Sequence, residues 1–407
     1  MTQKQKIQKA LTRGVENIYP SKASLEKILK SGKKLRLYNG IDPTGPTLHL
    51  GHLVQIMKLK QFQDLGHKII VLIGDFTAQI GDPTDKFAVR KQLTHKQVIK
   101  NCKGYKEQIG KILDLKKVEF KYNSEWLGKL SLTEIIELSA NFTAQQTLSR
   151  GMFKKRIQEG KDLYLHEFLY PMMQAYDSVY MDVDLEIGGN DQMFNMLAGR
   201  TLMKKMKNKE KFVLTTRLLS DSSGDKMGKT EGNMVALNEK PNEMFGQIMA
   251  WSDGLIIPAL ELCTDISMEE INQIEKDIKS NKLNPRDVKA KLAREIVGIY
   301  YSDKKAQKSE KEFENIFKNK ENPVSIPPYI LKGDKWQTYI AKGDKWQIID
   351  LLVEIKLASS KSEAKRLIEQ GGVKIDNQKI KDWQEKIKIK DKTIIQVGKR
   401  KFIEIKS

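Results

Sequence analysis

The sequence predicts an α/β protein with three parts: a doubly wound parallel-sheet domain, an α-helical domain and a small α+β tail domain. Three observations support this prediction. Strand and helix patterns alternate between residues 35 and 218, and helical patterns alone continue from about residue 239. The chain has 407 residues, which exceeds the size of one ordinary domain.

The first elements indicate a parallel pair of strands. Leu35–Tyr38 is a short strand pattern, and the loop Asn39–Thr47 is interrupted by Gly and Pro. His49–Leu65 has apolar residues at helical spacing, and Gly66 follows as a helix C-cap. Lys68–Ile73 is a largely β-branched apolar run, typical of a buried strand. A strand, a helix and a second strand form a βαβ unit with a right-handed crossover.

The same alternation continues through the middle of the chain. We predict strands at Val118–Tyr122, Val183–Ile187 and Phe212–Leu218, and helices at Ser131–Ser139, His166–Tyr176 and about Asp191–Lys205. A polar, Gly-containing loop follows at Ser220–Asn233. Repeated βα units of this kind form a Rossmann-like sheet, in which ligands bind at the carboxyl ends of the strands.

The second half of the chain defines the remaining domains. Helical patterns occur at Pro241–Ala250, Met268–Lys279, Pro285–Tyr301, Ile348–Leu357 and Ser360–Gln370, and short alternating strands follow. We therefore predict a Rossmann-like domain at 1–235, a helical domain at 236–325, a linker at 326–345 and a tail domain at 346–407. The hexapeptide KGDKWQ occurs at Lys332–Gln337 and again at Lys342–Gln347, which indicates a local duplication rather than a binding array.

Charge favours a polyanionic partner. Lys and Arg total 72 against 52 acidic residues, a net charge of +20, and cations along a phosphate backbone release its counterions. A lysine-rich, well-solvated surface is the alternative explanation. The tail carries Lys361, Lys365, Arg366 and Lys374, which suggests a nucleic-acid-binding module, with a small dimerisation domain as the alternative.

Cysteine usage and hydropathy indicate the cytoplasm. Cys102 and Cys263 are far apart and lack a metal-ligand spacing, so neither a zinc site nor a disulfide framework is expected. Met1–Gly14 has no apolar segment of a secretory signal, and apolar runs such as Ile69–Ile73 are too short to span a bilayer. We expect a cytoplasmic, soluble protein.

The segment PTGPTLHLGH, Pro43–His52, is the first candidate site. His49 and His52 are three residues apart at the start of a predicted helix, so their rings share a face. A helix N-terminus favours phosphate, and two imidazoles there can donate hydrogen bonds to phosphoryl oxygens as charge develops. The alternatives are a capping or packing role, or a zinc site, for which no third ligand is nearby.

A second candidate site is the segment DKMGKTEGN, Asp225–Asn233. Lys226 and Lys229 lie three apart in a loop after the last predicted strand, where two ammonium groups can neutralise a departing pyrophosphate. Such a loop alone is more often a solvated surface loop. Its occurrence together with the histidine motif of the same predicted sheet favours a functional site. The Walker pattern GxxxxGK[ST] is absent from the sequence, which argues against a P-loop ATPase.

These two motifs are similar to the HIGH and KMSKS signatures of class I aminoacyl-tRNA synthetases. Within that class, YNGIDPTGPTLHLGH, IGDFTAQIGDPTDK, HEFLYPMMQAYDS and EIGGNDQ resemble the bacterial tyrosyl-tRNA synthetase family. The resemblance covers essentially the whole chain. NPRDVKAKLAREIV at Asn284–Val297 resembles the helical anticodon-side domain, and the tail is similar to the RNA-binding fold of small-subunit ribosomal protein four.

The resemblance implies a role for each matching position. Tyr38 and Asp177 would bind the tyrosine phenol, Tyr170, Gln174 and Asp82 its ammonium, and Gln192 its carboxylate. Asp42, Gly189 and Asp191 would face the ribose and the aminoacyl junction. Thr44, His49, Gly51, His52 and Met227 would contact ATP, and Lys86, Arg90, Lys226, Lys229 and Thr230 would surround the leaving pyrophosphate. No metal-binding side chain is implied, because Mg²⁺ would enter with ATP through phosphate oxygens and water. The resemblance also implies a homodimer and a tRNA partner.

Helix spacing is compatible with these roles. Tyr170, Gln174 and Asp177 lie at i, i+4 and i+7, one face of a helix that Pro171 could kink. A phenol that donates to Asp177 and accepts from Tyr38 would leave both unpaired if phenylalanine bound instead.

The implied reaction is an in-line attack of the tyrosine carboxylate on the α-phosphate of ATP, followed by transfer to the 3′-terminal ribose of tRNA. Positioning and charge stabilisation would suffice, because a carboxylate is already a nucleophile. Gly228 replaces the serine of the class signature, and Glu186 stands where some relatives carry an amide. The rival readings are a tryptophan enzyme, another HxGH nucleotidylyltransferase, or an inactive synthetase-like RNA-binding regulator. Intact lysines and histidines argue against the last.

Overall fold

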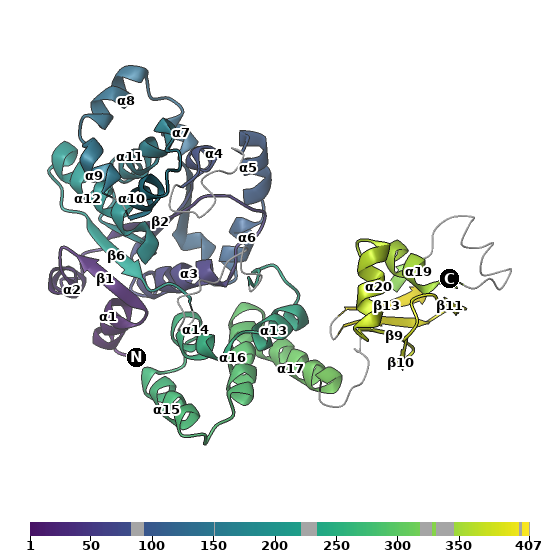
Figure 1. Ribbon diagram of the computed structural model, residues 1–407. Coiled ribbons are helices and arrows are strands. Elements are labelled where there is room, and N and C mark those ends of the chain that lie inside the picture. The colour runs from purple at the N-terminus through teal and green to yellow at the C-terminus, as the bar shows by residue number, and fades with distance from the viewer. Residues whose placement is uncertain are drawn as a thin grey trace. The chain divides into compact units, whose positions relative to one another are not determined.

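The computed structural model of the chain describes residues 1–82, 93–149, 151–220, 234–317, 328–330, 346–398 and 401–406. The chain forms two compact units, Met1–Gln307 and Lys308–Ser407 (Figure 1). The predicted boundary near residue 235 falls inside the first unit. There the strands end at β6 (Phe212–Thr216), and the described elements from α13 (Pro241–Met249) to α16 (Pro285–Tyr300) are helices.

The first unit is built on a six-stranded sheet of order β1-β6-β5-β2-β3-β4. Its other strands are β1 (Val15–Tyr19), β2 (Arg36–Ile41), β3 (Lys68–Ile73), β4 (Val118–Tyr122) and β5 (Leu185–Gly189). All neighbours are parallel except β1, which runs antiparallel to β6. The prediction of a parallel α/β sheet is confirmed, and β1 is an additional edge strand that the sequence did not reveal.

The order of the strands creates a switch point between β2 and β5. From β2 the chain adds β3 and β4 on one side, and later adds β5 and β6 on the other. Tyr38 on β2 pairs with Ile70 on β3 and with Glu186 on β5. In doubly wound sheets the ligand crevice lies outside the carboxyl ends of the strands at such a point.

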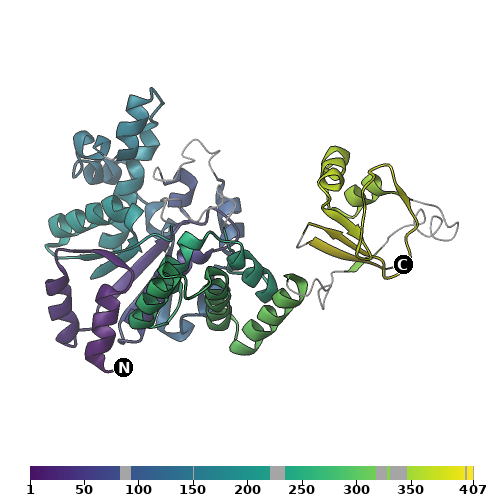
Figure 2. The ribbon, with the colours of Figure 1, turned by 60° about the horizontal axis from the view of Figure 1, so that its bottom comes forward.

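Helices cover both faces of the sheet (Figure 1, Figure 2). On one face lies α3 (Leu50–Gln63), which packs against α1 (Gln3–Thr12) and α14 (Ile256–Cys263). On the other, α11 (Leu165–Tyr180) and α12 (Met193–Lys207) pack against each other and bury Tyr38, Ile70 and Leu72. Since side chains alternate along a strand, Leu37 and Ile69 face the α3 layer.

The remaining elements of the first unit connect and extend these layers. The α-helices are α2 (Lys22–Lys30), α4 (Thr77–Ile80), α5 (His95–Cys102), α6 (Tyr105–Gly110), α7 (Ser124–Leu127), α8 (Leu132–Ser139), α9 (Ala144–Leu148), α10 (Gly151–Gln158), α15 (Met268–Lys279) and α17 (Asp303–Phe317), the last running on into the second unit. Short 3₁₀ turns occur at Leu115–Lys117, Asn190–Gln192 and Asp253–Leu255. The predicted helix near Asp191 thus begins with a 3₁₀ turn, and α11 continues through Pro171 as one helix.

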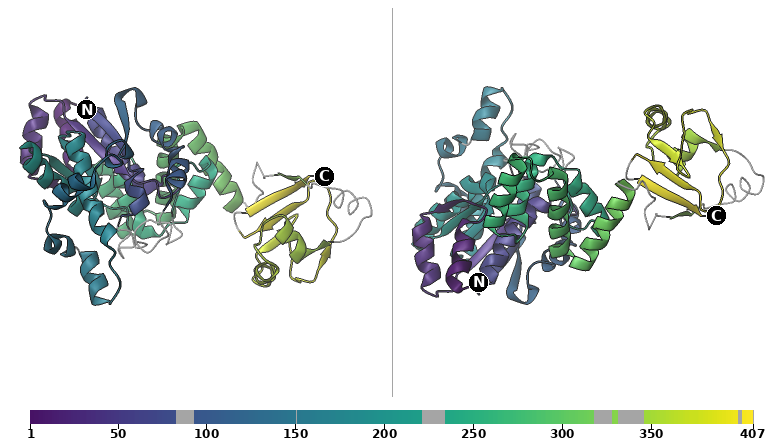
Figure 3. Two further views of the ribbon diagram at one scale, coloured as in Figure 1. Left: turned by 90° about the horizontal axis from the view of Figure 1, so that it is seen from above. Right: turned by 90° about the horizontal axis from the view of Figure 1, so that it is seen from below.

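The second unit contains a five-stranded sheet of order β10-β9-β12-β13-β7 and a two-stranded ribbon of β11 and β8. Its strands are β7 (Pro328–Ile330), β8 (Trp346–Gln347), β9 (Val373–Ile375), β10 (Gln378–Lys379), β11 (Lys386–Ile387), β12 (Ile394–Val397) and β13 (Lys401–Lys406). Helices α19 (Ile348–Glu354) and α20 (Lys361–Glu369) lie on one side of the sheet (Figure 3). The predicted linker therefore includes a strand, β7, which pairs in parallel with β13. Much of the linker, with the first KGDKWQ copy, lies outside the described residues.

In the described ranges no helix is long and apolar enough to cross a membrane.

Candidate active site

The predicted site residues that the structure describes gather at the carboxyl ends of β2 and β5. Asp42 directly follows β2, and Gly189 ends β5 and is followed by Asp191 and Gln192. The helix α11, which carries Tyr170, Gln174 and Asp177, crosses the same region. Lys86, Arg90, Lys226, Met227, Gly228, Lys229 and Thr230 lie outside the described residues.

The two histidines form a reciprocal cap at the start of α3. His49 is the N-cap residue, and its Nδ1 accepts the Gly51 amide at 3.1 Å. The Nδ1 of His52 accepts the His49 amide at 3.2 Å. A neutral imidazole that accepts at Nδ1 carries its proton at Nε2, so capping gives both rings the same donor nitrogen. The capping alternative and the phosphate-donor role are therefore compatible.

Close approach of the rings depends on Gly51. The ring centroids of His49 and His52 are 4.0 Å apart. A Cβ at position 51 would lie 2.8 Å from His49 Cε1, which is closer than such contacts allow. Thr44 is exposed in the preceding loop, where its amide donates to the Asp42 carbonyl at 2.8 Å.

The segment that follows the lysine loop is tied to the histidine motif. The Leu50 amide donates to the Val235 carbonyl at 3.0 Å, and the Leu237 amide donates to the Leu48 carbonyl at 2.8 Å. These bonds form an isolated antiparallel bridge between His49 and Ala236. The chain thus returns to the start of α3 a few residues after KMGKT.

Asp177 is a buried acceptor with two protein donors. Trp126 Nε1 donates to its Oδ1 at 2.8 Å, and Asn123 Nδ2 donates to its Oδ2 at 3.2 Å. Burial raises the pKa of Asp177 well above its ordinary value, and the Trp126 and Asn123 donors lower it. Each carboxylate oxygen has a second lone pair, so Asp177 can accept one more hydrogen bond.

Tyr38 is fully buried in the same cluster. Its hydroxyl shares a 2.9 Å hydrogen bond with Ser178 Oγ. Burial raises the pKa of Tyr38 well above its ordinary value, and the charges of Glu186 and Asp177 raise it further. The phenol therefore stays protonated and can donate. The resemblance implies that Tyr38 and Asp177 bind one end of the substrate, and the structure shows Ser178 as the hydrogen-bond partner of Tyr38.

Asp42 accepts two hydrogen bonds at the end of β2. Tyr170 Oη donates to its Oδ2 at 2.9 Å, and Thr77 Oγ1 donates to its Oδ1 at 2.8 Å. Burial raises the pKa of Asp42 to about 7, although both donors lower it. Thr77 also accepts from Asn123 Nδ2 at 3.0 Å, so Asp42 and Asp177 are connected through one buried chain of polar groups.

Gln192 joins the loop after β3 to the end of β5. Its Nε2 donates to Asp82 Oδ2, and its Oε1 accepts from Asn195 Nδ2 at 3.0 Å. Gln174 lies deeper and donates from Nε2 to Glu186 Oε1 at 3.0 Å. Its own Oε1 is buried and has no hydrogen-bond partner within the described part of the chain.

Sequence reasoning missed five supporting residues: Thr77, Asn123, Trp126, Ser178 and Lys211. Ser178 could have been predicted from the sequence, because it follows Gln174 by four residues and so lies on the same helix face. Lys211 precedes the apolar strand β6 and is fully buried, where an exposed lysine is the normal expectation. Asn123 and Trp126 belong to the start of α7, which directly follows β4, and the position of α7 beside Asp177 depends on the sheet order.

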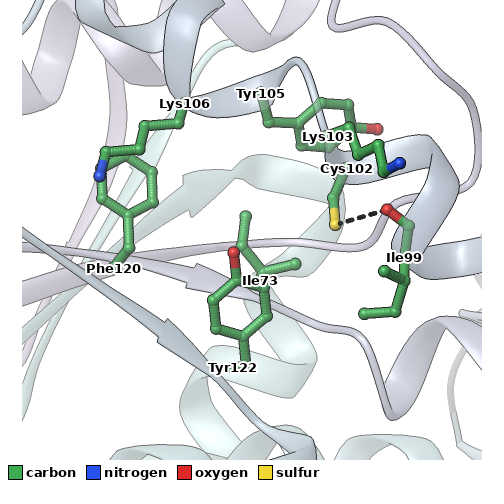
Figure 4. Close-up of a pocket in the computed structure, with 8 residues that line it drawn as sticks. All are labelled: Ile73, Ile99, Cys102, Lys103, Tyr105, Lys106, Phe120 and Tyr122. Atoms are coloured by element: carbon green, nitrogen blue, oxygen red, sulfur yellow. Dashed lines mark hydrogen bonds between the residues drawn. The ribbon is translucent and has the colours of Figure 1, made fainter.

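A cavity of about 350 Å³ lies elsewhere, between β4 and helices α5 and α6 (Figure 4). Its lining side chains are Ile73, Ile99, Cys102, Lys103, Tyr105, Lys106, Phe120 and Tyr122. No predicted site residue is among them. Among the described residues no three His, Cys, Asp or Glu side chains converge on a metal position.

Comparison with known proteins finds family models that match most of the chain. Residues 30–318 match the family model "tRNA synthetases class I (W and Y)", and residues 333–405 match the tyrosine–tRNA ligase SYY-like C-terminal domain. The chain is 45% identical to a tyrosine–tRNA ligase of Carboxydothermus hydrogenoformans, over 97% of this chain and 96% of the relative. It is 42% identical to that of Thermotoga maritima, over 100% and 98%.

Solved structures support the fold. A C-terminally truncated mitochondrial tyrosyl-tRNA synthetase of Aspergillus nidulans has a TM-score of 0.61 at 22% identity, covering 77% of this chain and 99% of that one. The tyrosyl-tRNA synthetase of Archaeoglobus fulgidus, solved with L-tyrosine, has a TM-score of 0.60 at 21% identity, covering 76% and 100%.

Proposed function

The chain belongs to the tyrosine branch of the class I aminoacyl-tRNA synthetases, and on that premise we propose how its residues activate tyrosine with ATP and load it onto tRNA. The observation that supports the assignment is that two groups of residues belong to one sheet. His49 and His52, which accept at Nδ1, cap α3, and a buried polar cluster in which Asp177 can accept a further hydrogen bond lies at the switch point of the same sheet.

The phenol of tyrosine binds between Asp177 and Tyr38. It donates to Asp177, which Trp126 and Asn123 hold in place as an acceptor. It accepts from Tyr38, whose hydroxyl is oriented by Ser178. Tryptophan offers one indole N–H and no acceptor, so it would leave Tyr38 without its partner.

The ammonium group binds to the Gln174 oxygen, which has no hydrogen-bond partner among the described residues, with Tyr170 and Asp82 beside it. Gln192 contacts the carboxylate end and anchors Asp82. Asp42, Gly189 and Asp191 face the ribose and the aminoacyl junction. The tyrosine carboxylate then attacks the α-phosphate of ATP in line, and no covalent enzyme intermediate is needed.

Phosphate charge is stabilised from the start of α3. His49 and His52 donate to phosphate oxygens from Nε2, and Thr44 also contacts the phosphates. The positive N-terminal end of the α3 dipole favours the same negative charge. Lys226, Lys229 and Thr230 precede Val235, whose carbonyl is hydrogen-bonded to Leu50 at the start of α3. Lys229 is six residues from Val235, so the chain between them spans at most roughly 20 Å. Lys86 and Arg90 complete the group around pyrophosphate. Mg²⁺ enters with ATP, held mainly by phosphate oxygens and water.

The charge of the chain favours tRNA as a partner. The basic tail domain binds tRNA, which is consistent with the net charge of +20 for the whole chain. We place the reaction in the cytoplasm, where tRNA is charged.

We propose a second copy of the chain as the partner that covers exposed apolar side chains of α8, α10 and α11. Leu132 and Ile136 on α8, Ile157 on α10 and Leu165 at the start of α11 are 73%, 59%, 53% and 85% exposed. Covering an exposed apolar side chain is favourable, and in a symmetric homodimer each such residue is buried on both copies. Sedimentation of Leu165→Lys should show monomers, whereas Leu283→Lys on another surface should leave dimers intact. Monomeric wild-type protein would refute the dimer.

Pyrophosphate exchange into ATP tests the activity directly. We expect exchange with tyrosine and background exchange with tryptophan or phenylalanine. Tryptophan-dependent exchange would overturn the roles of Tyr38 and Asp177. Absence of exchange by folded protein would support an inactive RNA-binding regulator instead.

A further inference from the structure

A buried ionic network lies directly behind the proposed tyrosine pocket. Glu186 on β5 is 2% exposed, and Lys211, the residue before β6, is 0% exposed. The Lys211 ammonium donates to Glu186 Oε2, and to Ser178 Oγ at 2.8 Å. Burying two charges costs free energy, and apolar residues of similar volume often stabilise a fold equally well. The pair is therefore better explained by what it positions.

The group that it positions is the side-chain amide of Gln174. Gln174 Nε2 donates to Glu186 Oε1 at 3.0 Å, while Gln174 Oε1 is buried and has no partner in the described part of the chain. A carboxylate can only accept hydrogen bonds, so it requires the NH₂ of the facing amide. Glu186 thereby determines which way the Gln174 amide points, and the oxygen is turned away from the network.

We propose that Glu186 and Lys211 are positioning residues that orient the Gln174 amide, so that its oxygen accepts a hydrogen bond from the ammonium group of tyrosine. This inference rests on the proposed role of Gln174 as an ammonium ligand. Lys211 contributes because an ammonium has donors and no acceptor. The Lys211 ammonium therefore requires an acceptor at position 186 and uses Glu186 Oε2, which leaves Glu186 Oε1 to accept from Gln174.

Gly199 provides the space for the lysine head. A Cβ on this residue of α12 would lie 2.6 Å from Lys211 Nζ and 2.9 Å from Ser178 Oγ. The close approach of α12 to α11 is thus compatible with the buried ammonium only because position 199 has no side chain. Tyr38 is linked to the same centre, because its hydroxyl bonds to Ser178 and Lys211 Nζ lies 5.8 Å from its ring centroid.

The decisive substitution is Glu186→Gln, which keeps shape and removes charge. Lys211 still requires an acceptor, so the new amide turns its oxygen to Lys211 and its NH₂ to Gln174. Gln174 must then turn its own oxygen toward that NH₂ and present its NH₂ to the ammonium group. We expect the KM for tyrosine to rise about 10- to 100-fold, the loss typical of a hydrogen bond to a charged group. The KM for ATP should stay within twofold.

A second substitution should reverse the effect. In Glu186→Gln/Lys211→Met the lysine no longer dictates the orientation of residue 186, so the two amides can pair with the Gln174 oxygen again facing the substrate. We expect the KM for tyrosine to recover at least fivefold relative to Glu186→Gln. A merely structural network predicts that the second substitution adds damage, and that result would overturn the proposal.

The ammonium itself can be removed from the ligand. The probe is 3-(4-hydroxyphenyl)propanoate, which is tyrosine without its amino group, used as a competitive inhibitor of pyrophosphate exchange. Its inhibition constant should be equal, within twofold, for wild type and Glu186→Gln. A rise that matches the rise in tyrosine KM would show that the whole pocket had changed, and would refute orientation of the amide.

Gln174→Ala separates this inference from the assignment beneath it. If Gln174→Ala leaves the KM for tyrosine unchanged, the ammonium role of Gln174 fails. If Gln174→Ala raises that KM while Glu186→Gln does not, the positioning role of Glu186 and Lys211 alone fails.

Discussion

Trp126 offers a test of how the pocket keeps Asp177 ready to accept the tyrosine phenol. Its indole N–H donates to Asp177 Oδ1 at 2.8 Å, and its side chain is 3% exposed. Burial raises the pKa of Asp177, and this indole is the largest of the influences that lower it. Trp126→Phe removes the donor and keeps an aromatic ring at the position.

The direction of the effect follows from the charge of the acceptor. Asp177 accepts from the phenol in its ionised form, so tyrosine kcat/KM should rise with pH as Asp177 ionises. A hydrogen bond to a charged group is worth about 1.5–3 kcal/mol. Its loss would raise the Asp177 pKa further, because the ionised form loses a donor. The ascending limb of the profile should therefore move to higher pH, and below that limb tyrosine kcat/KM should fall about 10- to 100-fold, the factor that corresponds to this hydrogen bond.

The assay is tyrosine-dependent pyrophosphate exchange at saturating ATP across pH, with kcat/KM reporting groups on the free enzyme. Trp126 also stacks on Tyr180, with ring centroids 4.5 Å apart, so Tyr180→Leu serves as the matched control. That control loses the stack, keeps the indole donor and should retain the wild-type pH limb. An unshifted limb in Trp126→Phe, with normal tyrosine kcat/KM, would refute the reasoning.

Three further predictions address other parts of the site. The pKa of Asp42 is raised to about 7, so the stability that its protonated form contributes is fully present below its unfolded pKa near 4 and is lost as pH rises through 7. Asp42→Asn does not titrate, so the difference in Tm between this variant and the wild type should shift in favour of the variant by about 2 °C or more from pH 5 to pH 8. Differential scanning fluorimetry at the two pH values measures this change. His52→Asn keeps an acceptor for the His49 amide and loses the Nε2 donor, so single-turnover activation should slow about 10²–10³-fold with tyrosine affinity unchanged. Arg366→Ala/Lys374→Ala in the tail should raise the KM for tRNA about 3- to 10-fold and leave pyrophosphate exchange unaltered.

The predicted elements that the structure confirms are those with strong periodicity. β3 has the bounds Lys68–Ile73 that its apolar run indicates, and α3 begins one residue after the predicted start. β1 was missed because Val15–Tyr19 is an edge strand with polar Glu16 and Asn17 and no fully buried residue. β7 was missed because it is three residues long and begins with Pro in a stretch that reads as linker.

The place of His49 and His52 at the start of α3 was predictable, because the motif fixes both their identity and their spacing. Hydrogen-bond direction was not predictable in the same way. Tyr38 and Glu186 come from strands nearly 150 residues apart in sequence, and they face one another because β2 and β5 pair in a register that places Tyr38 opposite Glu186. A shift of one residue would turn Glu186 to the α3 face and Gln174 would lose its acceptor.

The same dependence explains why buried charge is acceptable at this point in the fold. Lys211 directly precedes β6, and Glu186 lies on β5. Ser178 and Gln174 lie on successive turns of α11. Each group limits the hydrogen-bonding choices of the next, so three elements must be in register before the Gln174 oxygen faces the substrate. An apolar replacement of Lys211 and Glu186 could fill the volume equally well, but it would leave that amide free to turn either way. Orientation of a single amide is what the ionic pair adds to the pocket.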